Sequence, residues 1–244
     1  MKPEDLLNEI AGYCHQHASE EIVKKYSRYF KGGYQAYGLT QELYSEKVDE
    51  ILKKPGISLD LVIKTSRLLV TLPQYEMTSF AVLLIRYFQK QFTYDTFKVI
   101  EGWFETGIHN WAHCDVICSE LFPILYKKSL ISYQDLAPWK TAENKFQRRA
   151  VPVSMIKLLK THPDFNGFFQ FIDSMMMDKE REVHQGLGWF LREAWKINPQ
   201  VTEKFLLKWK NTAPRLIFQY ATEKMTPEAK LRFRKEKSFG TKVQ

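Results

Sequence analysis

Residues 181–197 read REVHQGLGWFLREAWKI, and this stretch decides the fold class. Its apolar residues recur at the spacing of one helical face, which predicts a buried stripe. The residues of that stripe are Val183, Leu187, Phe190, Leu191 and Ala194. Pro199 ends the pattern, so the stretch predicts one long helix followed by a very short link.

The same helical period continues in both directions along the chain. Helices are predicted at 4–18, 19–30, 41–54, 59–71, 75–91, 94–106, 110–128, 143–160, 165–177, 180–197, 200–210 and 215–236. Thr40, Ser58, Asn198 and Thr212 stand where N-caps are expected. No alternating pair of strands and no hairpin signal interrupts them. The fold class is therefore predicted to be all-α.

Short links between helices of this length imply antiparallel pairs. Stacked pairs of roughly 40 residues each make a superhelical solenoid of the HEAT-like or armadillo type. A globular all-α bundle also fits, because no sequence repeat is visible. We expect one helical-repeat domain over 1–238 and a basic tail over 239–244.

The charge of the 244-residue chain is unevenly distributed. The whole chain has 36 Lys and Arg against 28 Asp and Glu, a formal net charge of +8. Residues 141–244 hold 20 basic and 11 acidic residues, whereas 1–140 hold 16 and 17. This asymmetry favours a polyanionic partner such as nucleic acid. A solvated basic surface, or a helical scaffold for other proteins, are the alternatives.

Several protein classes are not expected. No apolar run approaches the roughly 18–20 residues of a membrane span, and the acidic start MKPEDLLNEI is unlike a signal peptide. The odd set of Cys14, Cys114 and Cys118 favours a reducing cytoplasm. His109 and His113 do not converge with the cysteines on one helix, so no metal and no cofactor are expected.

Two helices place unusual residues away from their apolar stripes. Opposite the stripe of 181–197 stand Gln185, Trp189, Arg192 and Lys196. This Trp among cations suggests a contact platform, although another helix could cover it. In 110–128, Trp111 and Asp115 are four residues apart and side by side at the stripe's edge. The carboxylate suits an anionic stabiliser, or it simply faces the helix dipole.

The helix at 143–160 carries a basic strip. Lys145, Arg149 and Lys160 fall together opposite its apolar face, which predicts an exposed surface for phosphates. A solvated basic face is the alternative. Pro152 should kink this helix or shift its start.

Together these segments resemble the DNA alkylation repair proteins, AlkD-like alkylpurine DNA glycosylases built of HEAT-like helix pairs. Gly188 to Glu193 is similar to that family's GW-x-LRE segment. Trp111 and Asp115 resemble its tryptophan and catalytic aspartate, and residues 147–150, QRRA, its arginine–alanine segment. Pro214-Arg215 and Tyr26 match weaker positions. The resemblance covers roughly 20–226.

This resemblance implies excision of cationic N3- and N7-alkylated purines from duplex DNA, without base flipping. The solenoid architecture suggests a monomer. Asp115 would act on the developing oxocarbenium ion, with Trp111 and Trp189 packed against the deoxyribose. DNA contacts are expected from Arg149, Arg192, Arg148, Lys145, Lys160, Lys196, Arg215 and Tyr26. We expect Trp111, Asp115, Arg149, Trp189 and Arg192 to converge on one concave surface.

The sequence departs from the family's pattern beside both site residues. The position after Trp111 is usually acidic and here is Ala112, and the usual valine before Asp115 is Cys114. Some relatives bind branched DNA without glycosylase chemistry. The alternative is therefore a non-catalytic binder of damaged or branched DNA on the same scaffold.

Overall fold

The structure is a computed structural model that describes residues 1–236. Within this range the chain forms fourteen α-helices, five short 3-10 helices and no strand, which confirms the all-α prediction. The predicted tail of 239–244 lies outside the described residues. The described chain divides into two compact units, Met1–Ser132 and Tyr133 onward. The single-domain boundaries and the superhelical path of the whole chain stay predictions.

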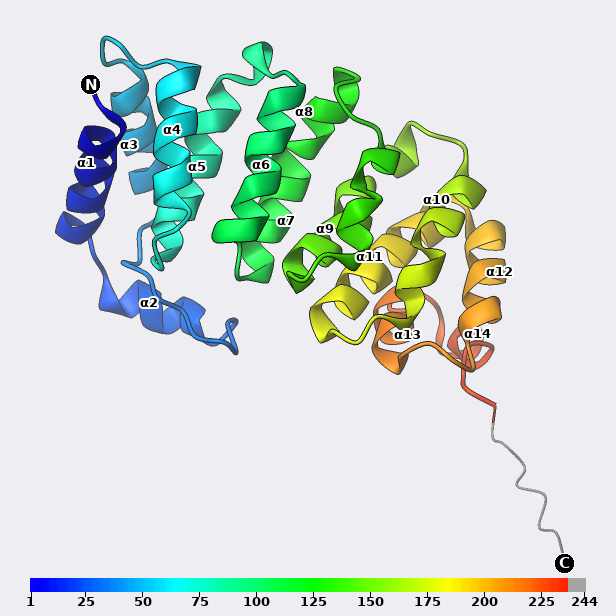
Figure 1. Ribbon diagram of the computed structural model, residues 1–244. Coiled ribbons are helices and arrows are strands. Elements are labelled where there is room, and N and C mark those ends of the chain that lie inside the picture. The colour runs from blue at the N-terminus through cyan, green and yellow to red at the C-terminus, as the bar shows by residue number, and fades with distance from the viewer. Residues whose placement is uncertain (237–244) are drawn as a thin grey trace, which may run out of the picture. The chain divides into compact units, whose positions relative to one another are not determined.

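The first unit consists of helices joined mostly by short turns, with a longer segment, residues 28–40, between α2 and α3. They are α1 (Pro3–Gln16), α2 (Glu20–Ser27), α3 (Gln41–Leu52), α4 (Leu59–Leu69), α5 (Tyr75–Tyr87), η1 (Gln89–Gln91), α6 (Tyr94–Thr106), α7 (Trp111–Glu120) and α8 (Phe122–Lys127). Figure 1 shows most of them side by side with roughly parallel axes, while α2 stands apart at the end of α1. No residue of α2 is buried, so this helix adds little to the core of the unit.

The second unit is built around one central helix. Its elements are η2 (Tyr133–Leu136), η3 (Pro138–Thr141), α9 (Lys145–Met155), η4 (Leu158–Lys160), α10 (Phe165–Ile172), η5 (Asp173–Met177), α11 (Arg181–Ile197), α12 (Pro199–Trp209), α13 (Arg215–Ala221) and α14 (Pro227–Leu231). The helix α11 packs against α9, α12 and α13. Its predicted stripe is completely buried, as expected for a central helix.

Most predicted helices are present, and the differences arise at prolines and turns. The predicted helix 110–128 breaks at Leu121, because Pro123 has no N–H for the continuing ladder. The predicted helix 215–236 ends at Ala221 and restarts at Pro227, a residue well suited to a first turn. Pro152 lies inside α9, which starts at Lys145 and ends by Met155.

The N-cap predictions are confirmed in three places and wrong in one. The side chains of Thr40, Ser58 and Asn198 accept hydrogen bonds from the backbone N–H groups of their helices' first turns. Thr212 does not cap a helix, because the chain turns there and Pro214 precedes the first residue of α13. Neither 3-10 helix between Tyr133 and Thr141 was predicted.

Candidate functional site

The start of α7 carries the Trp111–Asp115 pair of the first unit. The Asn110 side chain accepts a hydrogen bond from the backbone N–H of His113 at 2.9 Å, and the helix begins at Trp111. Trp111 is 39% exposed and Asp115 is half-buried. Residues four apart lie on the same face of a helix. Trp111 and Asp115 therefore lie on one face of α7, as their spacing predicted.

The Trp111 side chain is held by the segment after α2. Its indole N–H donates to the backbone carbonyl of Tyr29 at 3.3 Å. The Phe30 ring stacks on it with 5.6 Å between ring centroids and 19° between the planes. Both contacts come from residues more than 80 positions earlier, so tertiary structure fixes the orientation of this indole.

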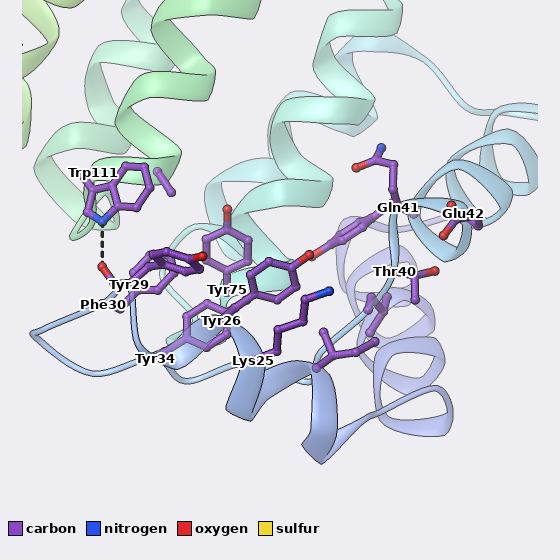
Figure 2. A pocket seen from close by; sticks show the side chains of 14 residues that line it. Lys25, Tyr26, Tyr29, Phe30, Tyr34, Thr40, Gln41, Glu42, Tyr75 and Trp111 are labelled. Atoms are coloured by element: carbon purple, nitrogen blue, oxygen red, sulfur yellow. Dashed lines mark hydrogen bonds between the residues drawn. The ribbon is translucent and has the colours of Figure 1, made fainter. Parts of the chain in front are cut away.

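Trp111 lines a cavity of about 680 Å³, here called the aromatic cavity. It lies between α2, the segment after it, α3 and the starts of α5 and α7. Its lining residues are Ile22, Lys25, Tyr26, Tyr29, Phe30, Tyr34, Leu39, Thr40, Gln41, Glu42, Tyr44, Tyr75, Trp111 and Ala112. Figure 2 shows Trp111 at one end, Gln41 with Glu42 at the other, and aromatic rings between them.

The aromatic cavity joins two residues that the sequence suggested separately. Tyr26, carried over from a weak resemblance, lines the same space as Trp111. Phe30, Tyr34 and Tyr75 were not singled out from the sequence. The close spacing of Tyr26, Tyr29, Phe30 and Tyr34 in a polar segment could have drawn attention to this region, because polar helices rarely carry so many aromatic rings.

A buried carboxylate holds the segment that supplies these rings. Glu76 on α5 is 1% exposed and accepts hydrogen bonds from the backbone N–H groups of Tyr37 and Gly38, both at 2.8 Å. Gly38 has φ of +85°, a conformation that favours glycine. Charge-assisted bonds of this kind are strong. Glu76 therefore fixes the chain between α2 and α3 against α5.

His113 anchors the first turn of α7 to α5. Its Nε2–H donates to the Tyr75 carbonyl oxygen at 3.0 Å, and its Nδ1 accepts from the Asn110 side-chain amide at 2.8 Å. Its ring stacks on Tyr75 with centroids 4.2 Å apart. Burial lowers the pKa of His113 to about 3, so the ring is neutral at physiological pH. With both ring nitrogens bonded inside the protein, His113 is a support for α7.

In the second unit, α11 presents Trp189 and Arg192 beside its buried stripe. Both side chains are half-buried, whereas the stripe is fully buried, which fits their predicted placement away from the stripe. The Arg192 guanidinium pairs with Glu193 and with Glu223, and Lys196 pairs with Glu193 at 2.8 Å. Hydrogen bonds from Lys196 and Arg192 outweigh burial and lower the pKa of Glu193. A phosphate at Arg192 would therefore have to compete with carboxylates.

Gly186 and Gly188 explain part of the motif around Trp189. A Cβ at Gly188 would lie 2.5 Å from Tyr220 Cβ, and one at Gly186 would lie 3.1 Å from Arg149 Cγ. These glycines let α13 and α9 approach α11 closely. The glycine before Trp189 is thus explained by helix packing within the unit.

The predicted exposed strip on residues 143–160 is wrong for Arg149. Its side chain is buried at 5% exposure, and its Nη1 donates to the Glu182 carbonyl oxygen at 2.8 Å. The strip is also interrupted, since α9 ends at Met155 and Lys160 belongs to a separate 3-10 turn. The periodicity placed Arg149 opposite the apolar face correctly, but α11 covers that side of α9.

Arg148 is also buried, and its contacts are internal. Its guanidinium pairs with Asp178 at 2.7 Å and donates to the carbonyl oxygens of Ala142 and Glu143. Buried arginines paired in this way are costly to disrupt. These bonds tie α9 to the segments on either side of it. The expected role of Arg148 in DNA binding stays a prediction.

The remaining predicted contacts are more accessible. Lys145 is half-buried and pairs with Glu182 at 2.8 Å, while Lys160 is exposed. Arg215 is exposed and lies over the Phe218 ring at 4.5 Å. Each could reach a phosphate with little cost to the core.

The five residues expected to converge are divided between the two units. Trp111 and Asp115 belong to the first, and Arg149, Trp189 and Arg192 to the second. Their convergence on one concave surface stays a prediction.

Among residues 1–236, no helix is both long and apolar enough to cross a membrane. The same residues contain no group of three or more His, Cys, Asp or Glu side chains arranged to hold a metal ion. All three cysteines are buried, as expected for small core residues.

Comparisons with known proteins give consistent matches. A model of the family described as DNA alkylation repair enzyme matches residues 14–225. A predicted DNA alkylation repair enzyme from Enterococcus faecalis aligns with TM-score 0.72 at 16% identity, covering 86% of this chain and 98% of that one. AlkD2 from Streptococcus mutans aligns with TM-score 0.55 at 18% identity, covering 84% and 97%. A search of curated proteins found no match. At these identities the structures establish the shared fold.

Proposed function

Because the chain belongs to the DNA alkylation repair enzyme family, we propose that it is a DNA glycosylase. Its substrates are cationic N3- and N7-alkylated purines in double-stranded DNA. The enzyme hydrolyses the N-glycosidic bond without flipping the base from the duplex. Alkylation at these positions makes the purine a good leaving group, so the protein needs only to stabilise charge on the sugar.

The observation that carries this proposal is the start of α7. A hydrogen bond and a ring stack hold Trp111 on the rim of the aromatic cavity, and Asp115 follows one turn later on the same face. An indole and a carboxylate on one face suit a cationic sugar, one by cation–π attraction and the other by charge.

The reaction balances with water as the only co-substrate. The bond between C1′ and the purine nitrogen breaks, and its electron pair leaves with the base, which becomes neutral. The Asp115 carboxylate stabilises the oxocarbenium ion and orients the water that adds to C1′, and the water's proton passes to solvent. An abasic site and a free alkylpurine are the products.

The second unit supplies the remaining proposed contacts. Trp189 packs on the deoxyribose and Arg192 holds a flanking phosphate. Phosphate contacts are also proposed for Lys145, Lys160, Lys196 and Arg215, with Tyr26 from the first unit, whereas the buried Arg148 and Arg149 are bonded inside the second unit. Lys160, Lys196, Arg215 and Tyr26 are exposed, and phosphate contacts position a protein on DNA without reading its sequence.

The test is release of 7-methylguanine from methylated duplex DNA by the wild type and by Asp115→Asn. This substitution keeps the side-chain volume and removes the charge, so base release should fall by roughly 100-fold or more while duplex affinity is kept. An Asp115→Asn protein with full activity would contradict the proposed role.

One observation favours the alternative of a non-catalytic binder of damaged or branched DNA. Ala112 lines the aromatic cavity next to Trp111, at a position that is usually acidic in the family this chain resembles. Cys114 stands where the family usually has valine. It is fully buried, so this difference affects packing in the core. If the wild type releases no base but binds duplex or junction DNA, the alternative holds, and Ala112→Glu is the first substitution to restore activity.

A further inference from the structure

The aromatic cavity contains more stacking surface than a duplex contact by Trp111 requires. Seven aromatic side chains line it: Tyr26, Tyr29, Phe30, Tyr34, Tyr44, Tyr75 and Trp111. Tyr26 and Tyr29 are 42% and 52% exposed. Clustered exposed aromatic side chains are unusual on a protein surface unless they contact a ligand.

Three of these rings form a continuous stack. Phe30 lies between Tyr34, at 4.5 Å and 17°, and Trp111, at 5.6 Å and 19°. Trp111 at the end of the stack is accessible. Nearly parallel rings with an accessible end suit a planar aromatic ligand, which would extend the stack by one layer.

The same segment carries cations beside its rings. Lys25 lies over the Tyr26 ring at 5.5 Å, and Arg28 lies over the Tyr29 ring at 4.8 Å. Neither forms an ion pair with a carboxylate anywhere in residues 1–236, in contrast to Arg192. Their charges are thus available to a phosphate next to a stacked ring.

The end of the cavity opposite Trp111 is polar. Thr40, Gln41 and Glu42 line it at the start of α3 (Figure 2). Hydrogen bonds from the Glu42 backbone N–H and from Thr40 lower the pKa of Glu42, so it is a carboxylate at neutral pH. A carboxylate accepts hydrogen bonds from the exocyclic amine of a base, for example cytosine N4.

We propose that the aromatic cavity binds an unpaired nucleotide of a DNA strand. Its base stacks among the rings, its amine edge faces Glu42, and Lys25 and Arg28 hold its phosphates. The cavity volume of about 680 Å³ lies within the range of sites for small molecules. This site goes beyond the proposed glycosylase function, since it takes a base that is already unpaired, as at a bulge or gap, and needs no chemistry at Asp115.

The experiment uses the full chain and a duplex with one bulged 2-aminopurine, whose fluorescence is quenched on stacking. A duplex with the same base paired is the comparison. Affinity is followed in parallel by the anisotropy of an end label. The wild type should quench the bulged probe and bind the bulged duplex more tightly than the paired one.

Tyr26→Ala and Tyr29→Ala are the test variants because both side chains are exposed and Tyr29 keeps the carbonyl that bonds Trp111. Each should abolish most of the quenching and weaken bulged-duplex binding at least about fivefold. Tyr87→Ala is the matched control, an exposed tyrosine at the far end of α5 from Tyr75. Twelve residues of helix separate them, about 18 Å, so this variant should behave as wild type.

Two further results decide the proposal. Glu42→Gln should remove a preference for short oligo-dC over oligo-dT. Binding of the bulged duplex without quenching, or quenching that both tyrosine variants retain, would overturn the assignment. Because these readouts do not involve base release, they can fail while the Asp115 test succeeds, and the reverse.

Discussion

At the scale of single residues, the buried polar groups of the first unit support the aromatic cavity without lining it. Glu76 orders the backbone at Tyr37 and Gly38, and His113 joins α7 to the Tyr75 carbonyl. Both side chains are buried and fully directed to internal partners. Glu76 and His113 thus hold the segments on either side of Trp111 although neither lines the aromatic cavity.

His113 makes stability depend on pH. Its pKa is lowered from 6.5 to about 3 in the folded protein. Between these values the unfolded chain binds a proton that the folded protein does not, so stability falls as pH decreases from about 6.5 towards 3. Between pH 7.5 and pH 5 we expect a loss of about 2 kcal/mol from this group.

Urea unfolding at both pH values, on the wild type and His113→Gln, measures this effect. The variant is expected to be less stable at pH 7.5 but to lose less stability on acidification. An identical pH dependence of the two proteins would show that His113 is not the group responsible.

At the scale of elements, α11 is the central helix of the second unit, and two glycines let its neighbouring helices pack closely against it. Gly186 faces α9 and Gly188 faces α13, and each lacks the Cβ that would separate the helices. The motif around Trp189 is therefore a packing device as well as a candidate DNA contact. Close approach of α9 also buries Arg149.

Gly188→Ala tests this packing. The added Cβ would meet Tyr220 Cβ at 2.5 Å and the Ile217 carbonyl oxygen at 2.8 Å, so we expect destabilisation of about 1–3 kcal/mol. Gly12→Ala in α1 is the control, because nothing lies within 4 Å of its added Cβ. That variant should gain roughly 0.5–1 kcal/mol from helix propensity. Urea midpoints compare the two, and equal shifts would argue against a steric cause.

At the scale of the whole molecule, the net charge of +8 predicts electrostatic binding to DNA. The excess lies in 141–244, but there Lys145, Arg148, Arg192 and Lys196 already have carboxylate partners. Lys25 and Arg28, which form no ion pair with a described carboxylate, occur in the first unit, where the net charge is close to zero. Net charge alone therefore gives an incomplete map of the phosphate contacts.

Duplex affinity should fall steeply with salt. Lys160 is exposed, so Lys160→Ala should lower the slope of log K against log salt by about one unit if this lysine contacts a phosphate. Anisotropy titrations between about 50 and 200 mM salt provide the slopes. A wild-type affinity that barely changes over this range would contradict the DNA-binding function.

Local features were predictable because the contacts that define a helix join residues close together in the sequence. The buried stripe of α11 and the caps at Thr40 and Ser58 follow from contacts three or four residues apart. The break before Pro227 was also visible in principle, as a Thr-Pro-Glu helix start.

The amino-acid sequence by itself determined the all-α class, the faces of the main helices and the family resemblance. Only the tertiary structure decided that Arg149 is buried and that Tyr26, Tyr34, Tyr75 and Trp111 share one cavity. The physical reason is that periodicity identifies the apolar face of a helix. Whether another helix packs over the polar face depends on elements distant in the chain. Gly186 and Gly188 let α9 and α13 pack closely against α11. The buried Glu76 carboxylate holds the segment after α2 against α5.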